Sequence, residues 1–297
     1  MGVGEGPRGD PVTRDDGARS ARSTRDETRP RFDAVSPSHP PLADVDTVLL
    51  DLDGCVWFGD QLADGAIELV AALRASGRTV GFLTNTSNHN ALHVAAKLVS
   101  LGIEATVEDV MMPVDSLAEH PMMRDRPRVW FFGPADIREA VAALAPLAET
   151  PEEADLVVLG RDTKLTYADL ADALHVLVRG GGLLAFNVDP RVPVEGGRML
   201  PGTGAVAAAL SYASGVQPEV VGKPAPVFFE AAMKRFGTTP ERAVMIGDTL
   251  DSDIAGGASV GMRTVLVGKG SLSSRDPAPV PDFRVARLRD VWSLIAG

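Results

Sequence analysis

The chain has 297 residues, a length that predicts about two domains at roughly 150 residues each. Hydrophobic residues make up 45% and charged residues 23%, which is ordinary globular usage and excludes disorder of the whole chain. A net charge of −11 argues against binding to nucleic acid or to an anionic membrane surface. No apolar stretch reaches the ~18 residues of a membrane span, and the single cysteine, Cys55, fits a reducing compartment. We therefore expect a soluble, cytoplasmic protein.

The first 43 residues differ in composition from the rest. Arg, Asp, Gly, Pro, Ser and Thr dominate them, and the apolar residues are too sparse to form a core. An apolar signal-peptide segment is lacking, and the acidic residues do not fit a transit peptide. We predict a disordered N-terminal extension over 1–43, and the sequence does not indicate its role.

Short apolar runs alternate with helical patterns from residue 45 onward. Runs at 45–51 and 79–84 predict strands that are buried on both faces of a parallel sheet. Between and after them, apolar residues recur at helical spacing up to Gly77 and Gly102, and glycine commonly ends a helix. Strands that alternate with helices predict an α/β fold.

A second set of strands and helices lies between two parts of this first set. Strands are expected at 128–132, 156–159 and 183–186, and helices near 136–145 and 167–179. After it, the alternation of strands and helices seen in the first set resumes, with strands expected at 220–221, 243–246 and 264–267. The simplest arrangement is one sheet domain, formed by 44–111 and 206–297, that is interrupted by an inserted αβ domain over 112–205.

Two carboxylates stand where the first predicted strand ends, in Asp51-Leu52-Asp53-Gly54. Ligands of open α/β sheets bind beyond the carboxyl ends of the strands, and a turn at Gly54 brings Asp53 back into the crevice of Asp51. A solvated Asp-x-Asp-Gly turn is the alternative that this motif alone leaves open.

Two further motifs carry groups that suit an anion. Thr84-Asn85-Thr86-Ser87 follows the second strand, where hydroxyl and amide groups donate hydrogen bonds to anions, although a helix cap is the simpler interpretation. Lys223, between Gly222 and Pro224, offers a compact positive charge for phosphate, and a surface lysine is its alternative.

An acidic cluster, Asp248, Asp251 and Asp253, follows the strand at 243–246. It places several carboxylate oxygens at one edge of the sheet, and Mg²⁺ is bound by a few carboxylates together with waters and substrate phosphate oxygens. A solvated acidic loop is the alternative.

Taken together and in this order, the four motifs resemble those of the haloacid dehalogenase superfamily, in particular its phosphatases. The resemblance implies a Rossmann-like parallel-sheet core with an inserted αβ cap. Residues 157–162, 165–167, 187–190 and 197–208 are similar to the cap of the NagD-like branch, which includes p-nitrophenyl, phosphoglycolate and glycerol-phosphate phosphatases. Thr86 and Phe186 depart from the usual Asn and Thr of this branch, and both are expected on the substrate side.

The resemblance also implies roles for single residues. Asp51 would attack phosphorus to form an aspartyl-phosphate, and Asp53 would act as general acid and base. The ligands of Mg²⁺ would be the Asp51 carboxylate, the Asp53 main-chain carbonyl and Asp248, with Asp253 ordering a bound water or acting from behind the ligands. Asp251 is a weaker candidate for that supporting role.

Phosphoryl oxygens would be bound by Thr84, the backbone at Asn85 and Lys223. Asn187, Asp189 and Arg191 lie on a cap loop and are expected to contact the substrate, and a turn stabilised by Asp189-Pro190 is the alternative. The expected function is Mg²⁺-dependent hydrolysis of a small phosphorylated metabolite whose identity the sequence leaves open. A protein that only binds such a metabolite and a phospho-aspartate signalling module are the alternatives. Dimers through the cap are common in similar proteins, so a homodimer is left open.

Overall fold

The computed structural model describes residues 2, 40–194, 198–271 and 273–296. Most of the predicted extension, 1–43, therefore lies outside the described residues. Its last part belongs to the packed fold, because Leu42 is fully buried and its N–H donates to the carbonyl of Leu294 at 2.8 Å. Among the described residues, no helix combines the length and the apolar character that are needed to cross a membrane.

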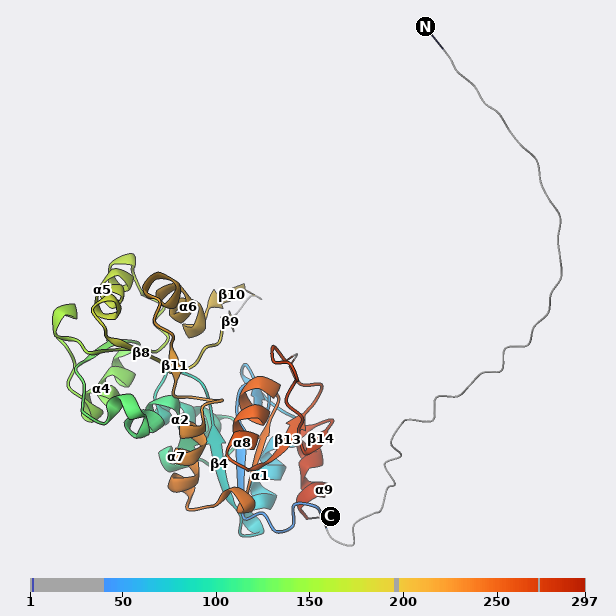
Figure 1. The fold of residues 1–297 in the computed structure, drawn as a ribbon. Coiled ribbons are helices and arrows are strands. Elements are labelled where there is room, and N and C mark those ends of the chain that lie inside the picture. Colours follow the sequence, from blue (N-terminus) through green and yellow to red (C-terminus); the bar gives the residue numbers. More distant parts are fainter. Residues whose placement is uncertain (1, 3–39, 195–197, 272, 297) are drawn as a thin grey trace. The chain divides into compact units, whose positions relative to one another are not determined.

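A six-stranded parallel sheet contains both the first and the last strand of the described chain (Figure 1). Its strand order is β14-β13-β12-β1-β4-β5. The strands are β1 (Thr47–Asp51), β4 (Thr79–Leu83), β5 (Val110–Met111), β12 (Ala243–Gly247), β13 (Arg263–Val267) and β14 (Phe283–Val285). Because β1 pairs with β4 on one side and with β12 on the other, the strand expected at 45–51 is the middle of the sheet.

Helices cover both faces of this sheet. Leu50 and Val48 pack with apolar residues of α1 and α2, whereas Leu49 between them packs with Phe228 and Phe229 of α7, as alternating side chains of a strand must. The helices of this part are α1 (Ala66–Ala75), α2 (Ala91–Ser100), α7 (Pro226–Phe236), α8 (Ala255–Ser259) and α9 (Trp292–Ile295). Both faces are buried, which explains the continuous apolar runs of its strands.

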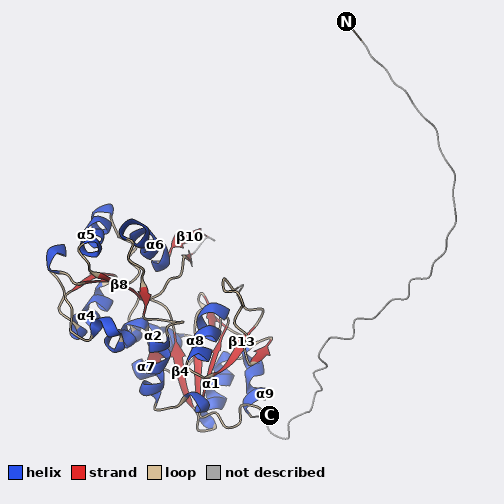
Figure 2. Ribbon diagram, viewed as in Figure 1, coloured by secondary structure: helices blue, strands red, loops and turns tan. Residues whose placement is uncertain are grey.

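The chain leaves the six-stranded sheet after β5 and builds a second, four-stranded parallel sheet in the order β11-β8-β7-β6 (Figure 2). Its strands are β6 (Val129–Phe132), β7 (Leu156–Leu159), β8 (Gly182–Ala185) and β11 (Glu219–Val220). One face packs against α5 and α6, and the other against α4. The helices here are α3 (Pro113–Ser116), α4 (Ala135–Leu144), α5 (Tyr167–Val178) and α6 (Thr203–Ser214). The α/β fold with an inserted αβ unit, predicted from the sequence, is confirmed.

The expected boundary of the inserted unit at 205/206 falls inside helix α6. In addition, β11 pairs with β8 of the second sheet, although the sequence placed this strand with the first one. We therefore propose that the inserted unit ends near Val221. The misplacement arose because a two-residue strand carries no pattern that tells which sheet it joins.

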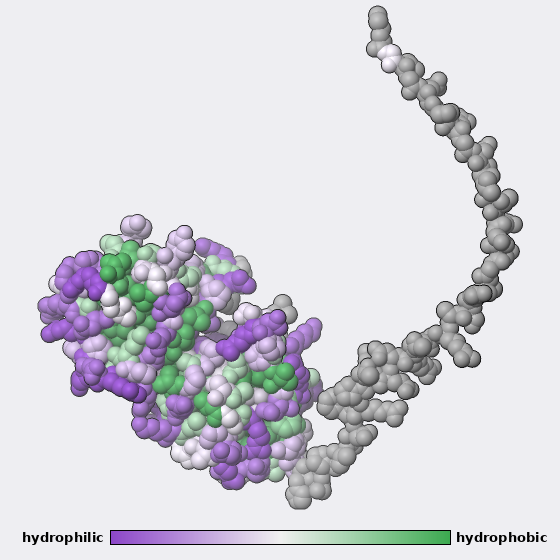
Figure 3. All heavy atoms as spheres, viewed as in Figure 1, coloured by the Kyte–Doolittle hydropathy of each residue, from purple (hydrophilic) through white to green (hydrophobic). Residues whose placement is uncertain are grey.

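Two short antiparallel hairpins complete the described elements. One joins β2 (Trp57–Phe58) and β3 (Gln61–Leu62) directly after the first motif. The other joins β9 (Arg191–Val194) and β10 (Arg198–Pro201) ahead of α6. In the view of Figure 3, hydrophilic side chains predominate on the visible face.

Candidate active site

The strand order reverses direction between β1 and β12. From β1 the chain moves outward through β4 to β5, and from β12 it moves outward on the other side through β13 to β14. Such a switch point opens a crevice at the carboxyl ends of the two central strands. Asp51 is the last residue of β1, and Asp248 follows the last residue of β12, so both carboxylates stand at this crevice.

Three carboxylates, those of Asp51, Asp248 and Asp253, meet here with one oxygen each within 4.8 Å of the others. A one-turn π-helix, Leu250–Ile254, turns Asp253 back toward β12, and such turns are frequent at functional sites. The carboxylate of Asp253 accepts the N–H of Thr249 at 3.1 Å. Gly247 is required beneath it, because a Cβ there would lie 2.3 Å from an Asp253 carboxylate oxygen.

The ammonium group of Lys223 lies between two of these carboxylates. It donates to Asp51 and, at 2.7 Å, to Asp253, and its side chain is only 3% exposed. Burial alone would lower the pKa of Lys223, but the carboxylates of Asp253 and Asp51 raise it above its ordinary value. Lys223 is therefore a permanent positive charge at the bottom of the crevice.

Negative charge nevertheless exceeds positive charge in this group. Burial and the nearby carboxylate of Asp253 raise the pKa of Asp51 well above its usual range, even though Lys223 opposes the shift. Burial and Asp253 likewise raise the pKa of Asp248. One ammonium does not neutralise three carboxylates, and a divalent cation would. Hard carboxylate oxygens at this spacing fit Mg²⁺, so the residues present suit the predicted metal.

Asp53 lies outside this carboxylate group. Its side chain accepts the indole N–H of Trp57 at 2.9 Å and faces the hydroxyl of Thr84 at 3.5 Å. The turn that follows Asp53 depends on Gly54, whose φ is +92° and whose Cβ would lie 2.6 Å from an Asp248 carboxylate oxygen. The carboxyl of Asp53 is thus available for proton transfer, and metal binding by its main-chain carbonyl stays a prediction.

Asn85 holds Lys223 in place. Its side-chain oxygen accepts the Lys223 N–H at 2.8 Å, and its amide donates to the Lys223 carbonyl at 2.9 Å. The Asn85 carbonyl in turn accepts the Asn187 amide at 2.8 Å, and Asn187 also accepts the N–H of Asp189 at 3.2 Å. Both asparagine side chains are committed to backbone groups, which leaves the predicted phosphate contact at Asn85 to its backbone.

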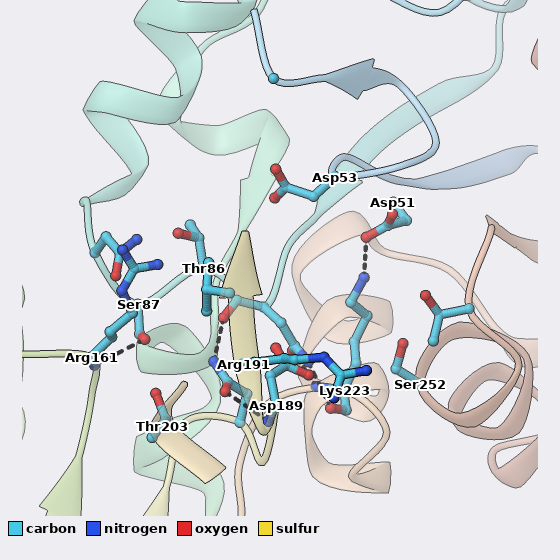
Figure 4. Close-up of a pocket in the computed structure, with 16 residues that line it drawn as sticks. Asp51, Asp53, Thr86, Ser87, Arg161, Asp189, Arg191, Thr203, Lys223 and Ser252 are labelled. Atoms are coloured by element: carbon cyan, nitrogen blue, oxygen red, sulfur yellow. Dashed lines mark hydrogen bonds and ion pairs between the residues drawn. The ribbon is translucent and has the colours of Figure 1, made fainter. Parts of the chain in front are cut away.

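A cleft of about 380 Å³ joins these groups to residues of the second sheet (Figure 4). Asp51, Asp53, Asn85 and Lys223 line it, together with Asn187 and Asp189 from the loop after β8. Arg191, which is expected to contact the substrate, also lines it, and so do Arg161 and Thr203, which were not expected as site residues. Arg161 had a detectable signal, because it follows strand β7 at the same kind of strand end as the four motifs.

Two expectations need correction. Phe186 does not face the cleft: it is 1% exposed and packs against Phe131 with ring centroids 6.0 Å apart, whereas Thr86 does line the cleft. Asp251 does not join the carboxylate group, because it accepts hydrogen bonds from Ser273 and Ser274 instead. Residues that are close together in one sequence motif thus lie in different surroundings in the fold.

Two family models match the chain. The haloacid dehalogenase-like hydrolase model matches residues 48–145, and a HAD-hydrolase-like model matches residues 220–291. Human glycerol-3-phosphate phosphatase is 32% identical, over 86% of this chain and 92% of the relative. This chain belongs to the haloacid dehalogenase-like hydrolases.

Solved structures of this hydrolase family agree in fold. A glycerol phosphate phosphatase from Mycobacterium tuberculosis, solved in complex with magnesium, has a TM-score of 0.76 and 34% identity, over 85% of this chain and 77% of that one. A thermostable NPPase mutant from Geobacillus stearothermophilus has a TM-score of 0.76 and 31% identity, over 84% of this chain and 98% of that one. The branch that the motifs indicated is confirmed.

The two family models divide the site. They include Asp51, Asp53 and Thr84 in one segment and Lys223, Asp248 and Asp253 in the other. Six residues that line the cleft lie between the matched segments: Arg161, Asn187, Asp189, Arg191, Val192 and Thr203. The two family models therefore include the residues at the Asp51 end of the cleft, and the residues at the Arg161 end lie outside both models.

Proposed function

We propose that the protein is a phosphatase that hydrolyses small-molecule phosphate monoesters, with Asp51 as nucleophile and Mg²⁺ as cofactor. The main support is the group of Asp51, Asp248 and Asp253, two of them buried, beside Lys223 at the strand-order switch. Relatives named as phosphatases, one of them solved with magnesium, support the same activity.

The first half of the reaction uses Asp51 and Asp53. A carboxylate oxygen of Asp51 bonds to phosphorus while the bond from phosphorus to the leaving oxygen breaks, and Asp53 gives its proton to that oxygen. Thr84, the backbone at Asn85 and Lys223 bind the phosphoryl oxygens, where positive charge and hydrogen-bond donors are most effective.

Hydrolysis of the aspartyl-phosphate completes the cycle. Asp53 takes a proton from a water molecule, the water oxygen bonds to phosphorus, and the bond between phosphorus and the Asp51 oxygen breaks, which releases inorganic phosphate and restores the Asp51 carboxylate. Asp53 is suited to both halves because the Trp57 indole and the Thr84 hydroxyl hold its side chain in place.

The residues that would hold Mg²⁺ are Asp51 and Asp248, with the main-chain carbonyl of Asp53, while Asp253 supports the site through Lys223 and Thr249. When bound, the cation supplies positive charge that stabilises the charge on the transferring phosphoryl group. Asn187 and Asp189, which line the cleft from the loop after β8, contact the leaving group.

A phosphate-release screen over a panel of phosphorylated metabolites tests this function. We expect many turnovers per enzyme with Mg²⁺ and loss of activity with EDTA, with kcat/KM ranking the substrates. Binding without release would instead favour a metabolite-binding protein, and a single burst that leaves stable phospho-aspartate would favour a signalling module. A homodimer through the inserted unit stays a prediction, and analytical ultracentrifugation tests it.

A further inference from the structure

Arg161 presents an unpaired positive charge to the cleft. It follows Gly160 at the end of β7, and its N–H donates to the hydroxyl of Ser87 at 3.1 Å, which fixes its backbone. Its side-chain Nε is buried, and none of the described residues offers it a hydrogen-bond acceptor. Burial lowers the pKa of Arg161, and no described carboxylate opposes that shift. Since a guanidinium stays protonated in proteins, this charge lacks a counter-ion among the described residues.

Thr203 adds a second unpaired polar group on the same wall. Its side chain is 2% exposed, and its hydroxyl has no hydrogen-bond partner among the described residues. It is the first residue of α6, a position where the helix dipole favours negative charge. Gly202 and Gly204 allow the helix start to press against the loop at 188–189, because a Cβ at either position would lie within 2.2 Å of a backbone oxygen of that loop.

Arg161 and Thr203 border the same two cavities. Both line the main cleft of about 380 Å³ and an adjoining cavity of about 20 Å³. In Figure 4 they lie on one side of the cleft, and Asp51 with Lys223 lies on the other. A ligand that reacts at Asp51 therefore extends its far end toward Arg161.

An anion is the ligand group that matches both residues. The planar guanidinium binds carboxylate or phosphate oxygens through parallel N–H donors, and the Thr203 hydroxyl can donate a further hydrogen bond. We propose that Arg161, assisted by Thr203, binds a second anionic group, a carboxylate or a phosphate, on the leaving group of the substrate. The proposal rests on the phosphatase function and names its substrate class: phosphate monoesters of small acids or small bisphosphates.

Matched pairs of esters test the proposal through kcat/KM. Two pairs compare a carboxylate with its neutral amide: 2-phosphoglycolate with its amide, and 4-carboxyphenyl phosphate with 4-carbamoylphenyl phosphate. A third compares propane-1,3-diol bisphosphate with the monophosphate. We expect the wild type to favour the charged member of at least one pair by about tenfold or more, as a charge-assisted hydrogen bond would. The pair that responds identifies the anion.

Variants of Arg161 and Thr203 test whether these residues cause the preference for the charged ester. Arg161→Met should bring the ratio of charged to neutral substrate close to one, and Arg161→Lys should keep part of it, because lysine retains the charge without the planar donors. Thr203→Val should lower the ratio severalfold. Arg138→Met, an exposed arginine on α4, is the matched control and should keep the wild-type ratio. A wild-type ratio near one in all three pairs, or an undiminished ratio in Arg161→Met, would overturn the proposal.

A binding measurement separates this proposal from the phosphatase function. Calorimetry with the Asp51→Asn variant and Mg²⁺ compares the dissociation constants of each charged ester and its neutral partner. If wild-type enzyme releases no phosphate from any ester, the proposed function fails, whereas tighter binding of the charged member would still support the anion subsite. Equal binding of both members, or no binding of either, would overturn the subsite.

Discussion

The two ends of the cleft differ in how completely their polar groups are paired. At Asp51, most buried polar groups are bonded: Lys223 bonds two carboxylates, and Asn85 bonds both the N–H and the carbonyl of Lys223. At Arg161, a guanidinium nitrogen and the Thr203 hydroxyl have no partner among the described residues. Pairing at one end fixes reacting groups before the substrate arrives, and unpaired donors at the other end are available for a ligand. We infer that the Asp51 end carries out the reaction and that the Arg161 end selects the substrate.

Removing the nucleophile should have the largest effect. Asp51→Asn keeps the shape and a hydrogen-bond acceptor for Lys223 but cannot form the acyl phosphate. We expect phosphate release to fall by at least about 10⁴-fold, and the phosphorylated adduct to be absent from quenched mixtures in mass spectrometry. Asp251→Asn, in the same loop but bonded to Ser273 and Ser274, is the control and should retain turnover. Near-normal turnover by Asp51→Asn would refute covalent catalysis here.

Removing the central ammonium should damage stability as well as activity. Lys223→Met leaves Asp51 and Asp253 buried without their partner, which typically costs about 3–5 kcal/mol. We expect urea unfolding in EDTA to show this loss in the free energy of unfolding. Adding Mg²⁺ should raise the free energy of unfolding of the variant by more than it raises that of the wild type. Lys234→Met is the comparison on the following helix. Its exposed pair with Glu119 at 2.7 Å should contribute no more than about 1 kcal/mol.

A pair of asparagine variants sharpens the contrast between the two ends. Asn85→Ala removes both hydrogen bonds to the Lys223 backbone, so we expect kcat to fall by about 10²-fold from misplaced groups. Asn187→Ala releases the loop at 188–189 from the Asn85 carbonyl and should mainly raise KM. Steady-state kinetics on one substrate distinguishes the two. The same change in kcat and KM for both variants would contradict the division of the cleft.

The smallest predicted effect concerns pH, away from the cleft. His120 is 4% exposed; burial lowers its pKa, although Glu219 at 3.3 Å opposes the shift. The unfolded chain therefore binds a proton more readily, so the free energy of unfolding should fall as pH drops below about 6.5, by at most about 1.4 kcal/mol per pH unit. Urea titrations at pH 7.5 and 5.5 check this. His120→Gln should reduce the difference in the free energy of unfolding between the two pH values. An unchanged difference in that variant would show that other groups cause the pH dependence.

The sequence predicted the end of the cleft at Asp51 better than the end at Arg161, for a physical reason. Asp51, Lys223 and Asp248 adjoin strand ends or a helix start, and parallel strands bring such positions to one edge whatever the loops do. Thr203 and Arg161 come together through the packing of α6 on the second sheet, which no local pattern encodes. The same limit explains Phe186: its motif position suggested the cleft, but burial against Phe131 uses it in the core.

The chain re-enters the first sheet through Val221 and Gly222, so Lys223 comes only three residues after β11. Gly222 tolerates no side chain, because a Cβ would lie 2.3 Å from the carbonyl oxygen of Phe186. If the inserted unit of a relative were grafted into this chain, the junction at its C-terminal end could be placed at only a few positions. A junction after Gly222 would combine a foreign last strand with the native lysine, whereas a junction at the expected 205/206 would cut helix α6 and divide the donor sheet between two parents.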